Sequence, residues 1–141
     1  MTFAIRNARE EDAEQIVDLI ADLGHAMTAQ GVREHIETLE RGDCPQIVAA
    51  RGDRLLGLCG LHVMVAIHRP LPIGRITILE VAPDIRGQGI GRALVEAAEE
   101  RLREAGCGLV EVTSNERLAE AHGFYRHLGF EHTSKRFAKE L

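Results

Sequence analysis

The sequence is poor in aromatic residues and in cysteine. Among 141 residues there is no tryptophan, one tyrosine, four phenylalanines and three cysteines. The cysteines (Cys44, Cys59 and Cys107) are scattered, odd in number and never in a C-x-x-C spacing, which argues against a disulfide framework. We therefore expect reduced thiols and a cytoplasmic location. Tyr125 is conspicuous because it is the only phenol in the chain.

Long hydrophobic runs and net positive charge are also lacking. No apolar run approaches the ~18 residues that a membrane span needs, and the charged first fourteen residues do not have the pattern of a signal peptide. With 17 basic and 22 acidic residues, the formal net charge is −5. A net-acidic domain has no overall attraction for nucleic acid or anionic lipid. We therefore expect no nucleic-acid or membrane partner, and any bound anion must be held by a local site.

The length and the hydrophobic pattern predict a single α/β domain over residues 1–141. The 45% hydrophobic content suits one well-packed core. Changes of period between two and about 3.6 predict the order β-α-α-β-β-β-α-β-α-β. The predicted elements are a strand at 3–6, helices at 16–23 and 32–39, strands at 47–50, 55–65 and 76–81, a helix at 93–105, a strand at 109–113, a helix at 118–128 and an extended piece ending at 141.

The strongest chemical signal is a glycine-rich segment between a predicted strand and a predicted helix. It runs Arg86-Gly-Gln-Gly-Ile-Gly-Arg92 and follows Pro83. Glycine lets a ligand approach the backbone, and a helix N-terminus offers unpaired N–H groups with a partial positive charge. Together these features predict a pyrophosphate cradle, with Arg86 and Arg92 as supporting cations. The alternative is a glycine-rich turn that merely connects strand to helix.

Two familiar nucleotide motifs do not fit this segment. A Walker A loop needs Gly-Lys-Ser/Thr, where this chain has Gly91-Arg92-Ala93. A dinucleotide fingerprint starting at Gly87 needs a third glycine, where Arg92 stands, and belongs near the start of a βαβ unit. Both nucleotide interpretations are therefore excluded.

The segment from Arg86 to Gly91 resembles the Arg/Gln-x-x-Gly-x-Gly/Ala acetyl-CoA loop of the GCN5-related N-acetyltransferases. Three further segments, in the order of that family, are similar to its opening, fourth-strand and closing motifs: Ile5-Arg6-x-Ala8 with Asp12, Leu79-x-Val81-x-Pro83, and His122-x-Phe124-Tyr125-x-x-x-Gly129-Phe130. Within the family, the chain resembles the aminoalkylphosphonate acetyltransferases, through Gly60-Leu61-His62, His68, Thr113-Ser114-Asn115-x-x-Arg117 and Phe137-x-Lys139-x-Leu141.

This resemblance implies a fold, a cosubstrate and a reaction. The fold would be a central mixed, mostly antiparallel sheet flanked by about four helices. Acetyl-CoA would be the cosubstrate, and its acetyl group would pass directly to the primary amine of a small molecule, an aminoalkylphosphonate or an amino-acid-like amine. The alternatives are a non-catalytic acyl-CoA binding or sensing module, a generic nucleotide binder, and a protein or peptide N-terminal acetyltransferase. A homodimer is common in the family.

The resemblance also assigns cofactor-binding and catalytic roles. Backbone groups of Leu79 and Val81 would hold the pantetheine arm, and Asn115 would add a polar contact. The pyrophosphate would lie on the loop made of Arg86, Gly87, Gln88, Gly89, Ile90, Gly91 and Arg92. Tyr125 would be the general acid that protonates the departing thiolate, because a phenol with pKa near ~10 suits a thiolate of similar basicity.

The general base and the acceptor-binding residues are less strongly indicated. Glu80 and Glu111 are the candidate bases, although a structural strand carboxylate or a water-relayed base would fit equally well. Strand alternation predicts that Glu80 shares a face with Ile76 and Ile78. His62 and His68 are expected to line the substrate pocket, and Arg75 or Arg69 to pair with an anionic tail of the acceptor. The five-residue spacing of His122 and His127 is poor for a metal site on one helix face, so we assign no metal ligands, and use of a divalent metal stays an open alternative of the resemblance.

Overall fold

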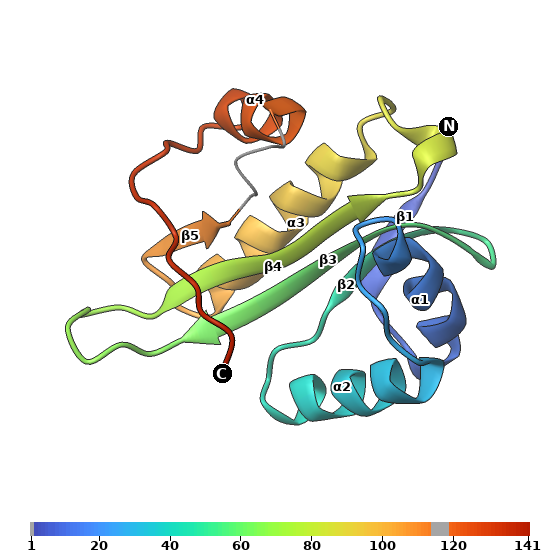
Figure 1. Ribbon diagram of the computed structural model, residues 1–141, viewed down its shortest axis with the longest axis horizontal. Coiled ribbons are helices and arrows are strands. Elements are labelled where there is room, and N and C mark those ends of the chain that lie inside the picture. The colour runs from blue at the N-terminus through green and yellow to red at the C-terminus, as the bar shows by residue number, and fades with distance from the viewer. Residues whose placement is uncertain (1, 114–118) are drawn as a thin grey trace.

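The computed structural model describes residues 2–113 and 119–141 of the chain (Figure 1). Its strands are β1 (Ala4–Asn7), β2 (Ile47–Arg51), β3 (Arg54–Met64), β4 (Ile73–Val81) and β5 (Leu109–Val112). Its helices are α1 (Ala13–Ala21), α2 (Ala29–Arg41), α3 (Ile90–Glu104) and α4 (Ala119–His127), with short 3-10 turns η1 (Glu10–Asp12) and η2 (Pro83–Ile85).

The predicted order of elements is confirmed as far as α4 and is wrong for the last element. Residues 128–141 form no strand, and the chain beyond α4 is an exposed irregular segment from Glu131 onward. The sequence predicted an extended piece there after a turn at Gly129-Phe130, but a strand requires a partner for its peptide groups. The predicted start of the last helix, Leu118, lies outside the described residues.

The five strands form one sheet in the order β1-β2-β3-β4-β5. Strands β1 to β4 are antiparallel to their neighbours, whereas β4 and β5 are parallel. Helix α3 covers one face and α1 and α2 cover the other (Figure 1). The predicted fold class, a mixed and mostly antiparallel sheet with four helices, is therefore confirmed.

A β-bulge interrupts the pairing of β3 with β4 halfway along. Gly60 pairs with Ile78 but the next residue, Leu61, pairs with Ile76, so that Thr77 is the extra residue. The bulge breaks the alternation of side chains on β4. Glu80 and Ile78 face α1, whereas Ile76 is on the same face as Gly74, whose α-carbon abuts Leu102 of α3. The prediction that Glu80 shares a face with both isoleucines is wrong for Ile76, because a bulge is a property of strand pairing and not of local sequence.

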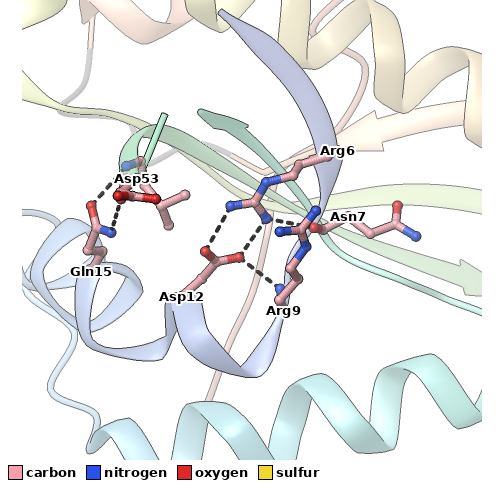
Figure 2. Close-up of polar contacts among 7 residues, drawn as sticks. Arg6, Asn7, Arg9, Asp12, Gln15 and Asp53 are labelled. Carbon is pink, nitrogen blue, oxygen red and sulfur yellow. Dashed lines mark hydrogen bonds and ion pairs between the residues drawn. The ribbon is translucent and has the colours of Figure 1, made fainter. Parts of the chain in front are cut away.

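The first helical turn is fixed by a buried carboxylate (Figure 2). Asp12 is 5% exposed and accepts two hydrogen bonds from the Arg6 guanidinium, at 2.8 and 2.9 Å, and one from the backbone N–H of Arg9, at 2.8 Å. Burial alone would raise the pKa of Asp12, but these hydrogen bonds outweigh it and leave the pKa below its ordinary value. The same view shows the Gln15 side chain at the β2–β3 turn, where its amide donates to the Asp53 carbonyl oxygen at 2.7 Å. These contacts connect the start of α1 to β1 and to the β2–β3 turn.

Candidate active site

Among residues 2–113 and 119–141, no strand pairs with the second half of β4 on its β5 side, and this part of β4 is called its free edge. Its pairing with β5 ends at Ile76 and Val112, whereas β4 continues to Val81. On the β3 side, the N–H of Ala82 donates to the Leu56 carbonyl at 2.9 Å, which identifies Val81 and Gly57 as a non-hydrogen-bonded pair. The peptide N–H and C=O of Val81, and by alternation those of Leu79, therefore point away from β3 toward the free edge. This edge can accept an extended ligand as an added strand.

The glycine-rich loop follows directly and leads into α3. Gly87 and Gly89 have φ of 80° and 82°, in the left-handed region that favours glycine. The first helical hydrogen bond is donated by Ala93 to the Gly89 carbonyl, and within the described chain the N–H groups of Ile90, Gly91 and Arg92 have no partner. Gln88 is exposed in this turn. Unpaired N–H groups at the start of a fifteen-residue helix make an anion-binding position.

The two arginines that flank the loop are engaged by other groups of the chain. Arg86 donates from Nε to the Val81 carbonyl oxygen at 3.2 Å and from Nη2 to Glu80 Oε1 at 2.8 Å. Arg92 donates from Nε to Glu96 Oε1 at 3.0 Å, one helical turn along α3. Both side chains are more than half exposed, so each can turn toward an anion at the loop.

Tyr125 lies on α4, on the α3 side of the free edge. Its ring packs edge-to-face against Phe124 and Phe130, at centroid distances of 5.4 and 5.7 Å. Phe124 in turn approaches Gly91, where a Cβ would lie 3.3 Å from Phe124 Cζ and 3.6 Å from Val81 Cγ2. Burial, with a smaller effect of Cys59, raises the pKa of Tyr125 to about 12. Within the described part of the chain its hydroxyl makes no hydrogen bond, so it is free to meet a ligand. Asn115, the other predicted contact near this position, lies outside the described residues.

The two candidate bases have different surroundings. Glu80 is 4% exposed; its Oε1 accepts from the Val81 N–H at 3.0 Å and from Arg86, while its buried Oε2 has no partner among the described residues. Glu111 is partly exposed on β5, and its Oε1 accepts two hydrogen bonds from Arg75, at 2.9 and 2.5 Å. Both carboxylates are therefore held by an arginine.

The predicted acceptor residues are brought together only in part. His62 pairs with Arg75 across β3 and β4, and Arg75 pairs with Glu111 across β4 and β5, which places the three in one row just before β4 and β5 part. His68 is exposed in the loop between β3 and β4, and no hydrogen bond or ion pair links it to this row in the described chain. The row is a polar site that the sequence indicated only as separate residues.

A hollow of about 400 Å³ lies beside the bulge, on the α1 side of β4. It is lined by Ile20, His25, Ala26, Met27, Thr77 and Ile78. A narrower hollow of about 170 Å³ shares Ile20, Met27 and Ile78 and extends under α2. Neither contains His62, His68 or Arg75, so sequence reasoning missed these lining residues. Gly24 indicated a helix end and thus a loop at His25, but nothing in the sequence indicated that this loop faces the bulge.

Across 2–113 and 119–141, no group of three or more His, Cys, Asp or Glu side chains is arranged to hold a metal ion. No helix in those ranges is long and apolar enough to cross a membrane.

Comparison with known proteins places this geometry in a family. The profile of the acetyltransferase (GNAT) family matches residues 4–130. An aminoalkylphosphonate N-acetyltransferase of Salmonella typhimurium strain LT2 is 33% identical over 139 residues, which cover 97% of this chain and 90% of the relative. The peptidyl-lysine N-acetyltransferase YjaB of Escherichia coli K12 is 28% identical and covers 100% of this chain and 90% of its own length.

A solved structure shows the same fold. The aminoglycoside N-acetyltransferase AAC(6')-Iy, solved in complex with CoA, has a TM-score of 0.86 at 16% identity, over 99% of this chain and 95% of its own. At that identity the likeness concerns the fold alone. The family match and the curated relatives favour the enzyme over the non-catalytic binding module and the generic nucleotide binder. The enzyme is therefore an N-acetyltransferase that uses acetyl-CoA as its cosubstrate, and this chain belongs to the acetyltransferase (GNAT) family.

Proposed function

We propose that the enzyme acetylates the primary amine of a small anionic molecule, with Tyr125 as the general acid. The observation that carries this proposal is the position of Tyr125: its ring packs on Phe124, which approaches Gly91 beside Val81, and its hydroxyl makes no hydrogen bond within residues 2–113 and 119–141. The Leu79 and Val81 peptide groups on that edge would hold the pantetheine arm, and the loop from Arg86 to Arg92 would hold the pyrophosphate. The thioester would then extend toward the hollow beside Thr77.

In the proposed reaction the neutral amine attacks the thioester carbon of acetyl-CoA. The C–N bond forms, the C–S bond breaks, and the departing thiolate takes the hydroxyl proton of Tyr125. The attacking nitrogen gives up one proton to a base. Because the pKa of Tyr125 is raised to about 12, its hydroxyl keeps its proton throughout the neutral range. The phenol is thus protonated at neutral pH, although a pKa of about 12 makes it a weaker acid than an ordinary phenol, whose pKa is close to that of a thiol.

For the base, the two carboxylates stay alternative proposals, and a water relay would connect either one to the amine. Glu80 offers a buried Oε2 that has no partner in the part of the chain the structure describes, on the same face of β4 as Ile78. Glu111 lies beside the point where β4 and β5 part. The test is to measure kcat against pH for Glu80→Gln and Glu111→Gln. The acidic limb of the profile reports protonation of the base, so it should disappear in the variant that lacks the base and persist in the other.

For the acceptor, we propose an aminoalkylphosphonate or an amino-acid-like amine whose anionic group meets Arg75. Two of the five N–H donors of this guanidinium are used by Glu111, and the side chain is 40% exposed. The remaining donors suit the oxygens of a phosphonate or carboxylate. The hollow of about 400 Å³, whose lining does not include Arg75, would hold only the remainder of such a molecule. The curated relative that acts on aminoalkylphosphonates covers nearly the whole chain.

The test is a panel of amines with release of free CoA thiol as the readout. We expect turnover of small anionic amines, and we expect Arg75→Ala to raise KM for them far more than for neutral amines while kcat changes little. Arg69→Ala, in the exposed loop after β3, tests the alternative that this arginine holds the anionic tail. Turnover of lysine peptides or protein N-termini, with none of any small amine, would support the alternative acceptor class and refute this one.

Cytoplasmic location and a homodimer are also proposed. Cys44, Cys59 and Cys107 are all free thiols, which is the usual state in a reducing compartment. Light scattering of the purified chain would decide between monomer and dimer.

A further inference from the structure

We infer that Glu80 and Arg86 together act as a displaceable plug on the β4 edge, occupying the Val81 peptide until acetyl-CoA binds. The inference rests on the proposed acetyl-CoA site on β4 and the loop, and adds to it a competition between the ligand and the protein's own side chains. The plug consists of these two side chains only.

The plug occupies both peptide groups that Val81 directs to the free edge. Glu80 Oε1 accepts from the Val81 N–H at 3.0 Å, and Arg86 Nε donates to the Val81 carbonyl oxygen at 3.2 Å. The two side chains are joined to each other by an ion pair of 2.8 Å. Together they present to Val81 an acceptor and a donor, which is what a neighbouring strand or an amide-containing ligand arm presents.

The two members of the plug differ in how easily they can move. Glu80 is 4% exposed, and its side chain can turn only within a packed environment. The Arg86 side chain is 56% exposed and belongs to the loop that would receive the pyrophosphate. A ligand arm with no phosphate displaces Arg86 from the Val81 carbonyl oxygen and gives the guanidinium no new anionic partner. A ligand with a pyrophosphate offers Arg86 a new anionic partner as it leaves Val81, so phosphate binding and arm binding become coupled.

This coupling predicts opposite effects of one substitution on two ligands. Arg86→Met removes the guanidinium but keeps a long side chain, so it opens the Val81 carbonyl and also removes a phosphate-binding cation. We expect pantetheine to bind roughly two- to tenfold more tightly, the range for loss of one competing hydrogen bond. We expect CoA to bind more weakly, because the charged contact to its pyrophosphate is lost.

Two further variants complete the design. Arg92→Met removes the other loop arginine, which contacts Glu96 and not the β4 edge, so it should weaken CoA and leave pantetheine unchanged. Glu80→Gln keeps an acceptor for the Val81 N–H but removes the charge that holds Arg86, so it should tighten both ligands. Thermal melting of each variant verifies folding. The chemical shift of the Val81 amide in 15N-labelled protein reports binding even at millimolar affinity.

The outcomes separate this inference from the function on which it rests. Tighter pantetheine and weaker CoA in Arg86→Met, with unchanged pantetheine in Arg92→Met, support the plug. If pantetheine binds Arg86→Met with unchanged or lower affinity, the plug is overturned. Weaker CoA binding by folded Glu80→Gln would also overturn it, because that result would show that Glu80 only positions Arg86 for phosphate. Wild-type protein that binds neither ligand would overturn the proposed acetyl-CoA site, and the plug with it.

Discussion

Removal of the Asp12 carboxylate should destabilise the whole domain, because Asp12 connects β1 to the start of α1 (Figure 2). Its three hydrogen bonds are all charge-assisted, and Asp12→Ala would leave the Arg6 guanidinium without its partner. Breaking a buried ion pair costs about 3–5 kcal/mol. The Arg6 side chain is 24% exposed and regains some water, so we expect about 2–4 kcal/mol, or a fall in Tm of roughly 6–12 °C for a chain of this length.

The assay is urea unfolding of wild type and Asp12→Ala between pH 7 and about pH 2, so that the range passes below the unfolded pKa of an aspartate. Asp84→Ala is the control, since its ion pair with Arg54 is exposed and should contribute under ~1 kcal/mol. Because the pKa of Asp12 is lowered on folding, its contribution is complete above the unfolded value near ~3.9 and is lost as pH falls through the folded value. The difference between wild type and Asp12→Ala should thus shrink on acidification. A loss no larger than that of Asp84→Ala, or a difference that grows toward low pH, would refute the reasoning.

Three further predictions concern the active site. Tyr125→Phe should lower kcat by ~10²–10⁴-fold with little change in CoA affinity, measured by steady-state kinetics and calorimetry; wild-type kcat would remove Tyr125 from the chemistry. Because its pKa is raised to about 12, deprotonation of Tyr125 should produce no loss of kcat between pH 7 and 10, and an alkaline limb in that range that disappears in Tyr125→Phe would contradict this role. Gly60→Ala should destabilise the protein by roughly 1–3 kcal/mol in thermal melts and lower kcat, because the new Cβ would lie 2.4 Å from Thr77 Oγ1 at the bulge. The control is Gly123→Ala on α4, where no described atom lies within 4 Å of the new Cβ, and it should be neutral or stabilising.

The sequence by itself determined the order of elements from β1 to α4 and the position of the glycine-rich loop. These features depend on local physics: the period of apolar residues, turn-forming glycines, and the need for positive φ at Gly87 and Gly89. The resemblance to the N-acetyltransferases, and not local physics, assigned roles to the peptide groups of Leu79 and Val81 and to Tyr125, the only tyrosine of the chain. In the structure the peptide groups of Leu79 and Val81 do point toward the free edge of β4. The roles of these groups and of Tyr125 stay predictions.

Only the tertiary structure decided what depends on strand pairing and on long-range contacts. The bulge at Thr77, which puts Ile76 and Ile78 on opposite faces, follows from register with β3. The row of His62, Arg75 and Glu111 requires three strands in register, and the hollow at His25 requires the loop between two helices to meet that bulge. The contacts of Arg86 with Glu80 and Val81 likewise depend on how the loop folds back on β4. None of these has a local signal, because a single strand does not encode which residue will face it or which of its edges will stay unpaired.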